Sequence, residues 1–313
     1  MKKEVKKIKL IAIGGPTASG KTEASLILVK KFSGAIISCD SRQIYKEMDV
    51  ATDKIPYSLP YHDPITFQGI DHFGINIAEI DKPFTLYDWM IYCREAIDKI
   101  NSDGKIPFMV GGTGLYIQSI IDNYELKPDF DVEQRDKLNK LSLPELQNML
   151  KKMNPDLYEK VDYKNPRRLI RAIEKSQMSN LKCQISNKDK FLTGEHINRF
   201  ESLVLSFRPD RELIRQRIEN RVKKHQVLGV IDEVKKLVEK YGPENEILNS
   251  TISVQEYIPY VLGKIKLEEA QERVVINNYQ YAKRQMTWFR KYGNTVFVDN
   301  VKEMDELIKK FLR

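Results

Sequence analysis

The chain has 313 residues, and its 52 Lys and Arg exceed its 44 Asp and Glu, which gives a formal net charge of +8. At the usual ~100–200 residues per domain, about two domains are expected, and a buried core can form without disulfides or metals. The chain is 31% charged and has no apolar run near the ~18 residues of a membrane span, so its composition argues against a disordered chain and a membrane bundle.

Short apolar runs alternate with helical patterns in the first part of the chain. Runs at 8–14, 35–39 and 106–110 predict buried strands, and periodic apolar positions predict helices over 22–32 and 85–101. Continuous apolar strands between amphipathic helices are typical of a parallel sheet with helices on both faces. The sequence therefore predicts an α/β fold.

The pattern becomes helical after residue 124. Prolines divide the helical stretch 132–180 into short helices at Pro144, Pro155 and Pro166. We therefore expect residues 125–195 to form an all-helical domain, inserted into an α/β core made of residues 1–124 and 196–313.

The last part of the chain returns to the α/β style. A strand is predicted at 203–207, long basic helices over 210–240 and 266–290, and a final strand at 295–298.

One segment between the first strand and the first helix has the spacing of a phosphate-binding loop. Its residues are Gly15, Pro16, Thr17, Ala18, Ser19, Gly20, Lys21 and Thr22. Glycines let backbone N–H groups curl around an anion, and the helix N-terminus adds partial positive charge. Lys21 can neutralise phosphate oxygens and the Thr22 hydroxyl can ligate Mg²⁺. The segment predicts a binding site for a di- or triphosphate. We therefore expect the core to be a parallel sheet of the P-loop NTPase type.

An acid follows the strand at 35–39. Asp40 could hold a metal ion, act as a base toward a second substrate, or cap the next turn. The strand at 106–110 ends instead in Gly111 and Gly112, where an ATPase would carry a metal-binding acid.

Seven segments in chain order together resemble one family, the tRNA dimethylallyltransferases (tRNA isopentenyltransferases), in their bacterial form. They read G-P-T-A-S-G-K-T at 15–22, D-S-R-Q-I-Y at 40–45, A-T-D-K at 51–54, G-G-T-G-L-Y at 111–116, N-P-R-R-L-I-R-A-I-E at 165–174, R-x-x-x-R at 217–221 and A-K-R-Q-M-T-W-F-R at 282–290.

The resemblance implies transfer of a dimethylallyl group from dimethylallyl diphosphate to the N6 amine of adenosine at tRNA position 37, with Mg²⁺ assisting and diphosphate leaving. It implies that Asp40 is the base, that Thr17 lies near the bridging oxygen, and that Arg217 and Arg221 bind the diphosphate. Thr22 and Asp40 are the expected metal ligands. The chemistry agrees, because a poor amine nucleophile needs a base and the leaving group needs fixed positive charge. A solvated helix face is the other interpretation of the two arginines.

The resemblance also implies contacts with RNA, since a base in a stacked loop must be extruded before it can be modified. The expected contacts are Asp40, Ser41, Arg42, Gln43, Thr113, Arg135, Arg167, Arg168 and Arg171. Eleven Lys and Arg stand against five acids over 151–190, where the family grips the anticodon stem-loop. The basic residues of the insert could instead belong to an ordinary solvated helical surface, and Thr113 could simply be part of a turn.

Two further functions remain open. An adenylate isopentenyltransferase would share the core motifs and prenylate free AMP, ADP or ATP; the changed segments at 251–256 and at Tyr279 favour it, and the basic insert favours RNA. A kinase or ATPase would use the loop for ATP.

The three cysteines, Cys39, Cys93 and Cys183, are far apart and predict reduced thiols. We expect a cytoplasmic monomer with no membrane partner.

Overall fold

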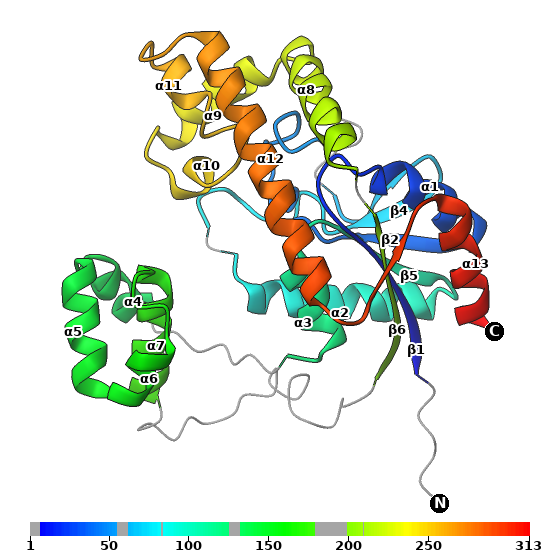
Figure 1. Ribbon diagram of the computed structural model, residues 1–313, viewed down its shortest axis with the longest axis horizontal. Helices are drawn as coiled ribbons and strands as arrows, with labels where there is room; N and C mark the ends of the chain where they lie inside the picture. Colours follow the sequence, from blue (N-terminus) through cyan, green and yellow to red (C-terminus); the bar gives the residue numbers. More distant parts are fainter. Residues whose placement is uncertain (1–6, 55–61, 83, 125–131, 179–198, 209) are drawn as a thin grey trace, which may run out of the picture. The chain divides into compact units, whose positions relative to one another are not determined.

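The computed structural model describes residues 7–54, 62–82, 84–124, 132–178, 199–208 and 210–313 (Figure 1). The chain divides into two compact units. One comprises Met1–Tyr124 and Ile197–Arg313, and the other comprises Glu125–His196.

A seven-stranded sheet forms the centre of the first unit, with the order β3-β4-β2-β5-β1-β6-β7 (Figure 1). The strands are Ile8–Gly14 (β1), Gly34–Ser38 (β2), Ile65–Phe67 (β3), Ile70–Phe73 (β4), Ile106–Gly111 (β5), Phe200–Phe207 (β6) and Thr295–Val298 (β7). Neighbouring strands run parallel except β3 and β4, which form an antiparallel hairpin at one edge. The predicted fold class is confirmed, with this hairpin as an addition to the expected parallel sheet.

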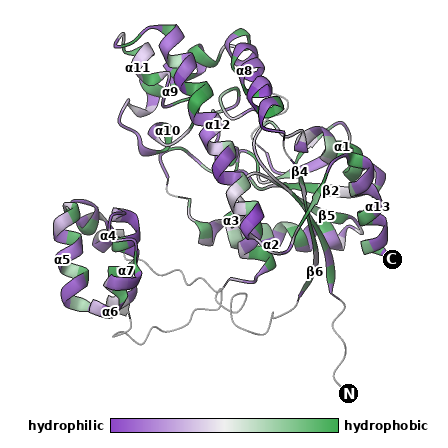
Figure 2. Cartoon of the chain, in the orientation of Figure 1, coloured by the Kyte–Doolittle hydropathy of each residue, from purple (hydrophilic) through white to green (hydrophobic). Residues whose placement is uncertain are grey.

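Helices cover both faces of the sheet. Helices α1 (Lys21–Lys31) and α13 (Val301–Leu312) pack on one face, and α2 (Leu86–Ser102) and α3 (Gly114–Ile121) lie on the other. The strands are apolar along most of their length, whereas the helices carry polar as well as apolar residues (Figure 2). Burial of these matching faces is the main favourable term in forming the layers.

A second core lies where the loop after β2 meets the C-terminal helices. These helices are α8 (Arg211–Val227), α9 (Val230–Tyr241), α10 (Glu246–Asn249), α11 (Ile258–Val261) and α12 (Leu267–Lys291). Ile44 and Met48 of the loop pack in one apolar cluster with Val234, Tyr257 and Val274. The loop that begins at Asp40 is therefore held from the side opposite the sheet.

The expected single helix over 210–240 is wrong. Helix α8 ends at Val227 and α9 begins at Val230, because Gly229 takes a φ of 88°. That left-handed conformation costs glycine little and ends the helical hydrogen-bond pattern. The helix predicted over 266–290 and the strand predicted at 295–298 are confirmed.

The second unit is helical over its described residues 132–178. Its helices are α4 (Val132–Asn139), α5 (Leu143–Met153), α6 (Pro155–Lys160) and α7 (Pro166–Met178). Each of the three expected prolines stands in the first turn of a helix, where the missing N–H costs nothing. Leu146, Leu150, Leu169 and Ile173 form its core.

Candidate active site

The phosphate-binding loop joins the end of β1 to the start of α1. Gly15 and Gly20 take φ values of 130° and 90°. A Cβ on Gly15 would lie 2.8 Å from Ser206 Oγ, so that position has neither the conformation nor the space for a larger residue. Strand, glycine loop and helix N-terminus follow one another in the arrangement that binds anions.

A cavity of about 510 Å³ opens beside this loop. It is lined by ten of the residues expected from the sequence: Thr17, Ala18, Ser19, Gly20, Lys21, Thr22, Asp40, Gln43, Arg217 and Arg221. Apolar side chains line it as well, namely Leu26, Ile36, Phe67, Ile75 and Val110. The cavity therefore offers an anion site and an apolar wall to the same ligand.

Two polar groups of the loop are suited to an anion. Lys21 Nζ donates to Pro16 O at 2.6 Å, and burial lowers the pKa of Lys21 to about 8, against the opposing effect of the Asp40 carboxylate. The buried Ser19 Oγ has no hydrogen-bond partner among the described residues. A buried hydroxyl without a partner costs free energy, which an oxygen of a bound phosphate would recover.

Asp40 stands two residues after the end of β2, in the cavity wall. Its Oδ1 accepts from Arg42 N at 2.8 Å and from Gln43 N at 3.4 Å. The carboxylate thus caps the following turn and also faces the cavity, where it could hold a metal ion or act as a base.

The other residues of this loop hold it in place. Ser41 N donates to Thr113 Oγ1 at 3.1 Å, which joins the loop to the start of α3. Gln43 Oε1 accepts from Ser38 Oγ, and Gln43 Nε2 donates to the carbonyl oxygens of Thr52 and Asp53. In this conformation the amide of Gln43 is occupied within the protein. Arg42 and Thr113 are partly buried and do not line the cavity.

Helix α8 brings two arginines to the cavity. Arg217 Nη1 donates to Ala18 O in the phosphate-binding loop at 3.3 Å. Arg221 Nη2 donates to Asn278 Oδ1 at 2.8 Å, and its Nη1 lies 3.7 Å from Asp53 Oδ2. The spacing of four residues places both on one helix face, and that face lines the cavity.

Gln285 on α12 is a site residue that the sequence reasoning missed. Its Oε1 accepts from Thr17 N at 2.7 Å, and its Nε2 donates to Gly112 O at 3.0 Å. The side chain is buried, and a Cβ on Gly112 would lie 2.0 Å from it. The segment at 282–290 was recognised as a motif, but its helical spacing did not reveal which side chain faces the loop.

The arginines expected to bind RNA in the second unit fall into two groups. Arg135 makes two 2.6 Å hydrogen bonds to the buried Glu174, which also pairs with Arg171. Arg167 and Arg168 are exposed, and Arg168 lies 3.5 Å from Asp162. Binding of RNA by these residues stays a prediction, and three lysines of the basic stretch lie outside the described residues: Lys182, Lys188 and Lys190.

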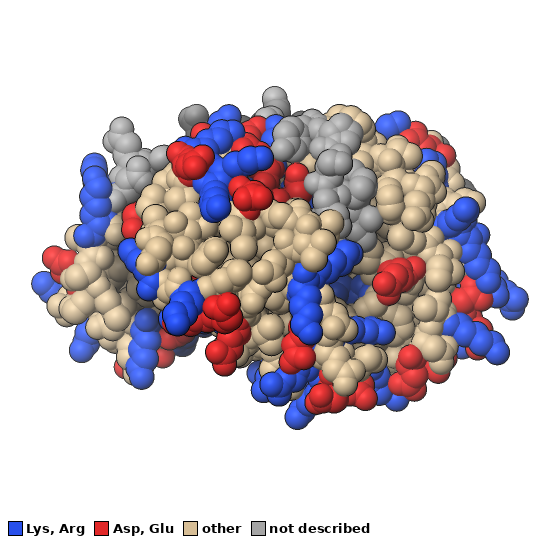
Figure 3. Space-filling model, turned by 90° about the horizontal axis from the view of Figure 1, so that it is seen from above, with Lys and Arg blue, Asp and Glu red and all other residues tan. Residues whose placement is uncertain are grey.

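On the face seen in Figure 3, charge alone marks no single binding surface. Lysines and arginines alternate with acids over the face seen in Figure 3. Within the described residues, no group of three His, Cys, Asp or Glu side chains is placed to hold a metal ion. No described helix is long and apolar enough to span a membrane. Cys39 and Cys93 are free and buried, and Cys183 lies outside the described residues.

Comparisons with known proteins identify the family of this chain. A family model described as IPP transferase matches residues 43–292. The curated tRNA dimethylallyltransferase of Staphylococcus haemolyticus is 36% identical over 92% of this chain and 85% of its own length. That of Thermoanaerobacter pseudethanolicus is 34% identical over 98% of this chain and 97% of its own.

Solved structures give the same result. The tRNA isopentenylpyrophosphate transferase of Bacillus halodurans superposes with a TM-score of 0.70 and 31% identity, over 98% of this chain and 97% of that one. A eukaryotic dimethylallyltransferase, solved acting on tRNA, gives a TM-score of 0.72 and 28% identity over 94% of this chain and 74% of its own. With the matched model covering most of its length, the chain belongs to the IPP transferase family, the tRNA dimethylallyltransferases.

Proposed function

We propose that this enzyme transfers the dimethylallyl group of dimethylallyl diphosphate to the N6 amine of adenosine at position 37 of tRNA. The family supports tRNA modification by dimethylallyl transfer. The main support for the proposed roles of individual residues is one cavity, which is lined by the phosphate-binding loop, Asp40, two arginines and apolar side chains.

The donor occupies the cavity with its diphosphate on the loop. Backbone N–H groups, Lys21 and the unpartnered Ser19 hydroxyl bind its oxygens, with Thr17 beside the bridging oxygen. Arg217 and Arg221 reach the same region from α8. These fixed groups stabilise the charge that grows on the leaving diphosphate. The apolar side chains suit the five-carbon group.

Mg²⁺ fits the residues present. The Thr22 hydroxyl and the Asp40 carboxylate both line the cavity, and they are the hard oxygen ligands that Mg²⁺ prefers. Because the described residues hold no cluster of metal ligands, further ligands would come from the diphosphate and water. When bound, the ion adds positive charge beside the leaving group.

The acceptor adenine is extruded into the cavity with its amine facing Asp40. The amine nitrogen forms a bond to the first carbon of the prenyl group, and the bond from that carbon to the diphosphate oxygen breaks. The amine proton passes to Asp40, and the electron pair of the broken bond leaves with the diphosphate. Ser41, Arg42 and Thr113 are proposed to hold the RNA around this base, and the insert arginines are proposed to bind the RNA backbone.

The test is a transfer assay with labelled dimethylallyl diphosphate and an anticodon stem-loop that carries adenosine at position 37. Asp40→Asn, which keeps the size of the side chain, is expected to lower kcat by about 10²–10⁴-fold, the usual contribution of a general base, while pyrophosphate still binds. Asp103→Asn removes a surface carboxylate and serves as the control. Normal turnover by Asp40→Asn would exclude Asp40 as the base.

The same assay separates the alternatives. AMP outcompeting the stem-loop would favour an adenylate isopentenyltransferase. ATP hydrolysis without prenyl donor would favour an ATPase. We also propose that the enzyme acts as a monomer in the cytoplasm. Sedimentation of the purified protein measures its mass in solution and so tests the monomeric state.

A further inference from the structure

The segment A-T-D-K at 51–54 has no role in the mechanism above, yet two of its residues, Thr52 and Asp53, line the cavity. Asp53 Oδ1 lies 3.1 Å from His225 Nε2, and its Oδ2 lies 3.7 Å from Arg221 Nη1. An acid therefore stands beside an arginine that is proposed to bind an anion.

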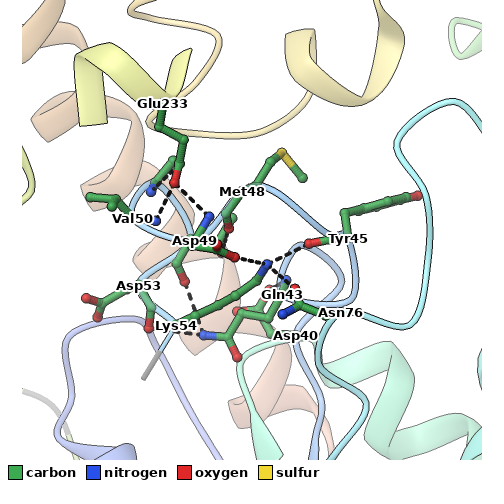
Figure 4. Close-up of polar contacts among 12 residues, drawn as sticks. Asp40, Gln43, Tyr45, Met48, Asp49, Val50, Asp53, Lys54, Asn76 and Glu233 are labelled. Carbon is green, nitrogen blue, oxygen red and sulfur yellow. Dashed lines mark hydrogen bonds and ion pairs between the residues drawn. The ribbon is translucent and has the colours of Figure 1, made fainter. Parts of the chain in front are cut away.

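The backbone at Asp53 is set by its surroundings. Its φ of 57° is left-handed, a region that aspartate and asparagine enter more readily than most residues but still at a cost. Lys54, which follows, is fully buried and donates to Tyr45 O, Asp49 Oδ1 and Asn76 Oδ1 at 2.5–2.7 Å. Figure 4 shows the two neighbouring side chains pointing in opposite directions, Lys54 inward and Asp53 away from it.

A second carboxylate holds the loop from α9. Glu233 accepts from the backbone N–H groups of Asp49, Val50 and Ala51 at 2.7–2.9 Å (Figure 4). The Gln43 side chain binds the carbonyl of Asp53 itself. Buried and partly buried hydrogen bonds thus hold the backbone on both sides of Asp53, which sets the place of its carboxylate at the cavity.

Arg221 is held by one partner and neutralised by another. Asn278, which is neutral, accepts a 2.8 Å hydrogen bond from the guanidinium. Asp53 supplies charge at 3.7 Å, which exceeds hydrogen-bond distance. The two side chains are 19% and 35% exposed, and such loose, partly solvated pairs are weak. A diphosphate on the loop would compete with the Asp53 carboxylate for the same guanidinium.

We propose that Asp53 is the intramolecular counter-ion of Arg221, and that a bound diphosphate displaces the Asp53 carboxylate from this pair. This inference rests on the proposed function of the cavity. With no diphosphate bound, Asp53 positions the guanidinium at the cavity wall. With diphosphate bound, the same carboxylate competes with the anion for the Arg221 guanidinium, so it weakens binding of the diphosphate product and favours its release. Asp53 is a positioning residue, since it acts through Arg221.

The test is the affinity of the full-length protein for inorganic pyrophosphate with Mg²⁺, measured by calorimetry. Asp53→Asn keeps the shape of the side chain and tolerates the left-handed backbone, and it removes only the charge. It is expected to tighten binding about threefold or more, the scale of a partly exposed ion pair. Structural damage would weaken binding, so the direction of the change is diagnostic. An unchanged or weaker affinity in Asp53→Asn would overturn the inference.

A double-mutant cycle shows whether the effect passes through Arg221. In an Arg221→Ala background, Asp53→Asn is expected to lose its gain. Glu23→Gln removes another carboxylate of the cavity wall and should have a smaller effect, equal in both backgrounds. If Asp53→Asn still tightened pyrophosphate binding in the Arg221→Ala background, the carboxylate would act on the anion through its general electric field. That result would overturn the proposed role of the Asp53–Arg221 pair. If the wild-type protein bound no pyrophosphate, the proposed donor site would fail first, and this inference with it.

Discussion

Lys21 shows how one residue can set the pH range of the donor site. Burial lowers its pKa to about 8, because the ammonium loses hydration that the nearby Asp40 and Asp53 carboxylates only partly replace. The side chain is charged below this pKa and becomes neutral as the pH rises through it. Binding of an anion requires the charged form.

We therefore expect kcat/KM for dimethylallyl diphosphate to fall between pH 7 and pH 9, as Lys21 loses its proton. A Lys21→Arg variant is the control, because a guanidinium stays charged throughout this range. Its activity will be lower, but its profile should be flatter. Parallel profiles for the two proteins would assign the titration to another group.

Gln285 allows a second test at the scale of one residue. Replacing it with leucine leaves the buried Thr17 N–H and Gly112 C=O without their partner. Each unpaired buried group costs about 1–3 kcal/mol, so Gln285→Leu should lower the free energy of unfolding by about 2 kcal/mol or more. Gln280→Leu, at an exposed position of the same helix, should change it by less than about 0.5 kcal/mol. Chemical denaturation measures both.

At the scale of elements, most of the core pattern was predicted, but the hairpin at the edge of the sheet and the break inside one long helical stretch were not. Helix α12 spans 25 residues with a clear apolar stripe, whereas β3 and β4 have three and four residues, too few to show a period. The break at Gly229 was missed because apolar and charged residues continue on both sides of it. The phosphate-binding loop was found because all its residues are adjacent in the chain.

Gln285 and Asp53 could not be found in the same way. Each acts on a residue far away in sequence, and only the folded topology brings the partners together. Arg217 and Arg221 were found from the resemblance, since helical spacing alone left a solvated face possible.

The contact between α9 and the loop at 49–54 provides a prediction for elements. Glu233→Gln keeps one acceptor but places an amide donor where three backbone N–H groups converge. Hydrogen bonds to a charged group are worth about 1.5–3 kcal/mol each, so thermal unfolding should show a loss of at least about 2 kcal/mol. Glu239→Gln, on the exposed face of the same helix, should leave the melting temperature nearly unchanged.

At the scale of the whole molecule, we expect the core to carry out prenyl transfer and the helical unit to bind RNA. The core contains the cavity, and the helical unit presents Arg167 and Arg168 at its surface. A charged surface that binds RNA backbone acts through counter-ion release, so its contribution depends on salt.

A double variant, Arg167→Glu with Arg168→Glu, is therefore expected to weaken tRNA binding and to reduce the slope of affinity against salt by about one for each lost phosphate contact. The KM for dimethylallyl diphosphate should not change. Lys302→Glu, an exposed lysine of the core, is the control. Equal salt slopes for wild type and double variant would exclude these arginines from the RNA interface.

The hydrogen bond between Thr17 and Gln285 has a consequence for synthesis of the chain. The two residues are 268 positions apart, so the phosphate-binding loop leaves the ribosome long before its partner does. The loop can reach its final shape only after Gln285 has been synthesised and α12 has folded against it. We therefore expect shorter chains that lack Gln285 to bind the donor weakly.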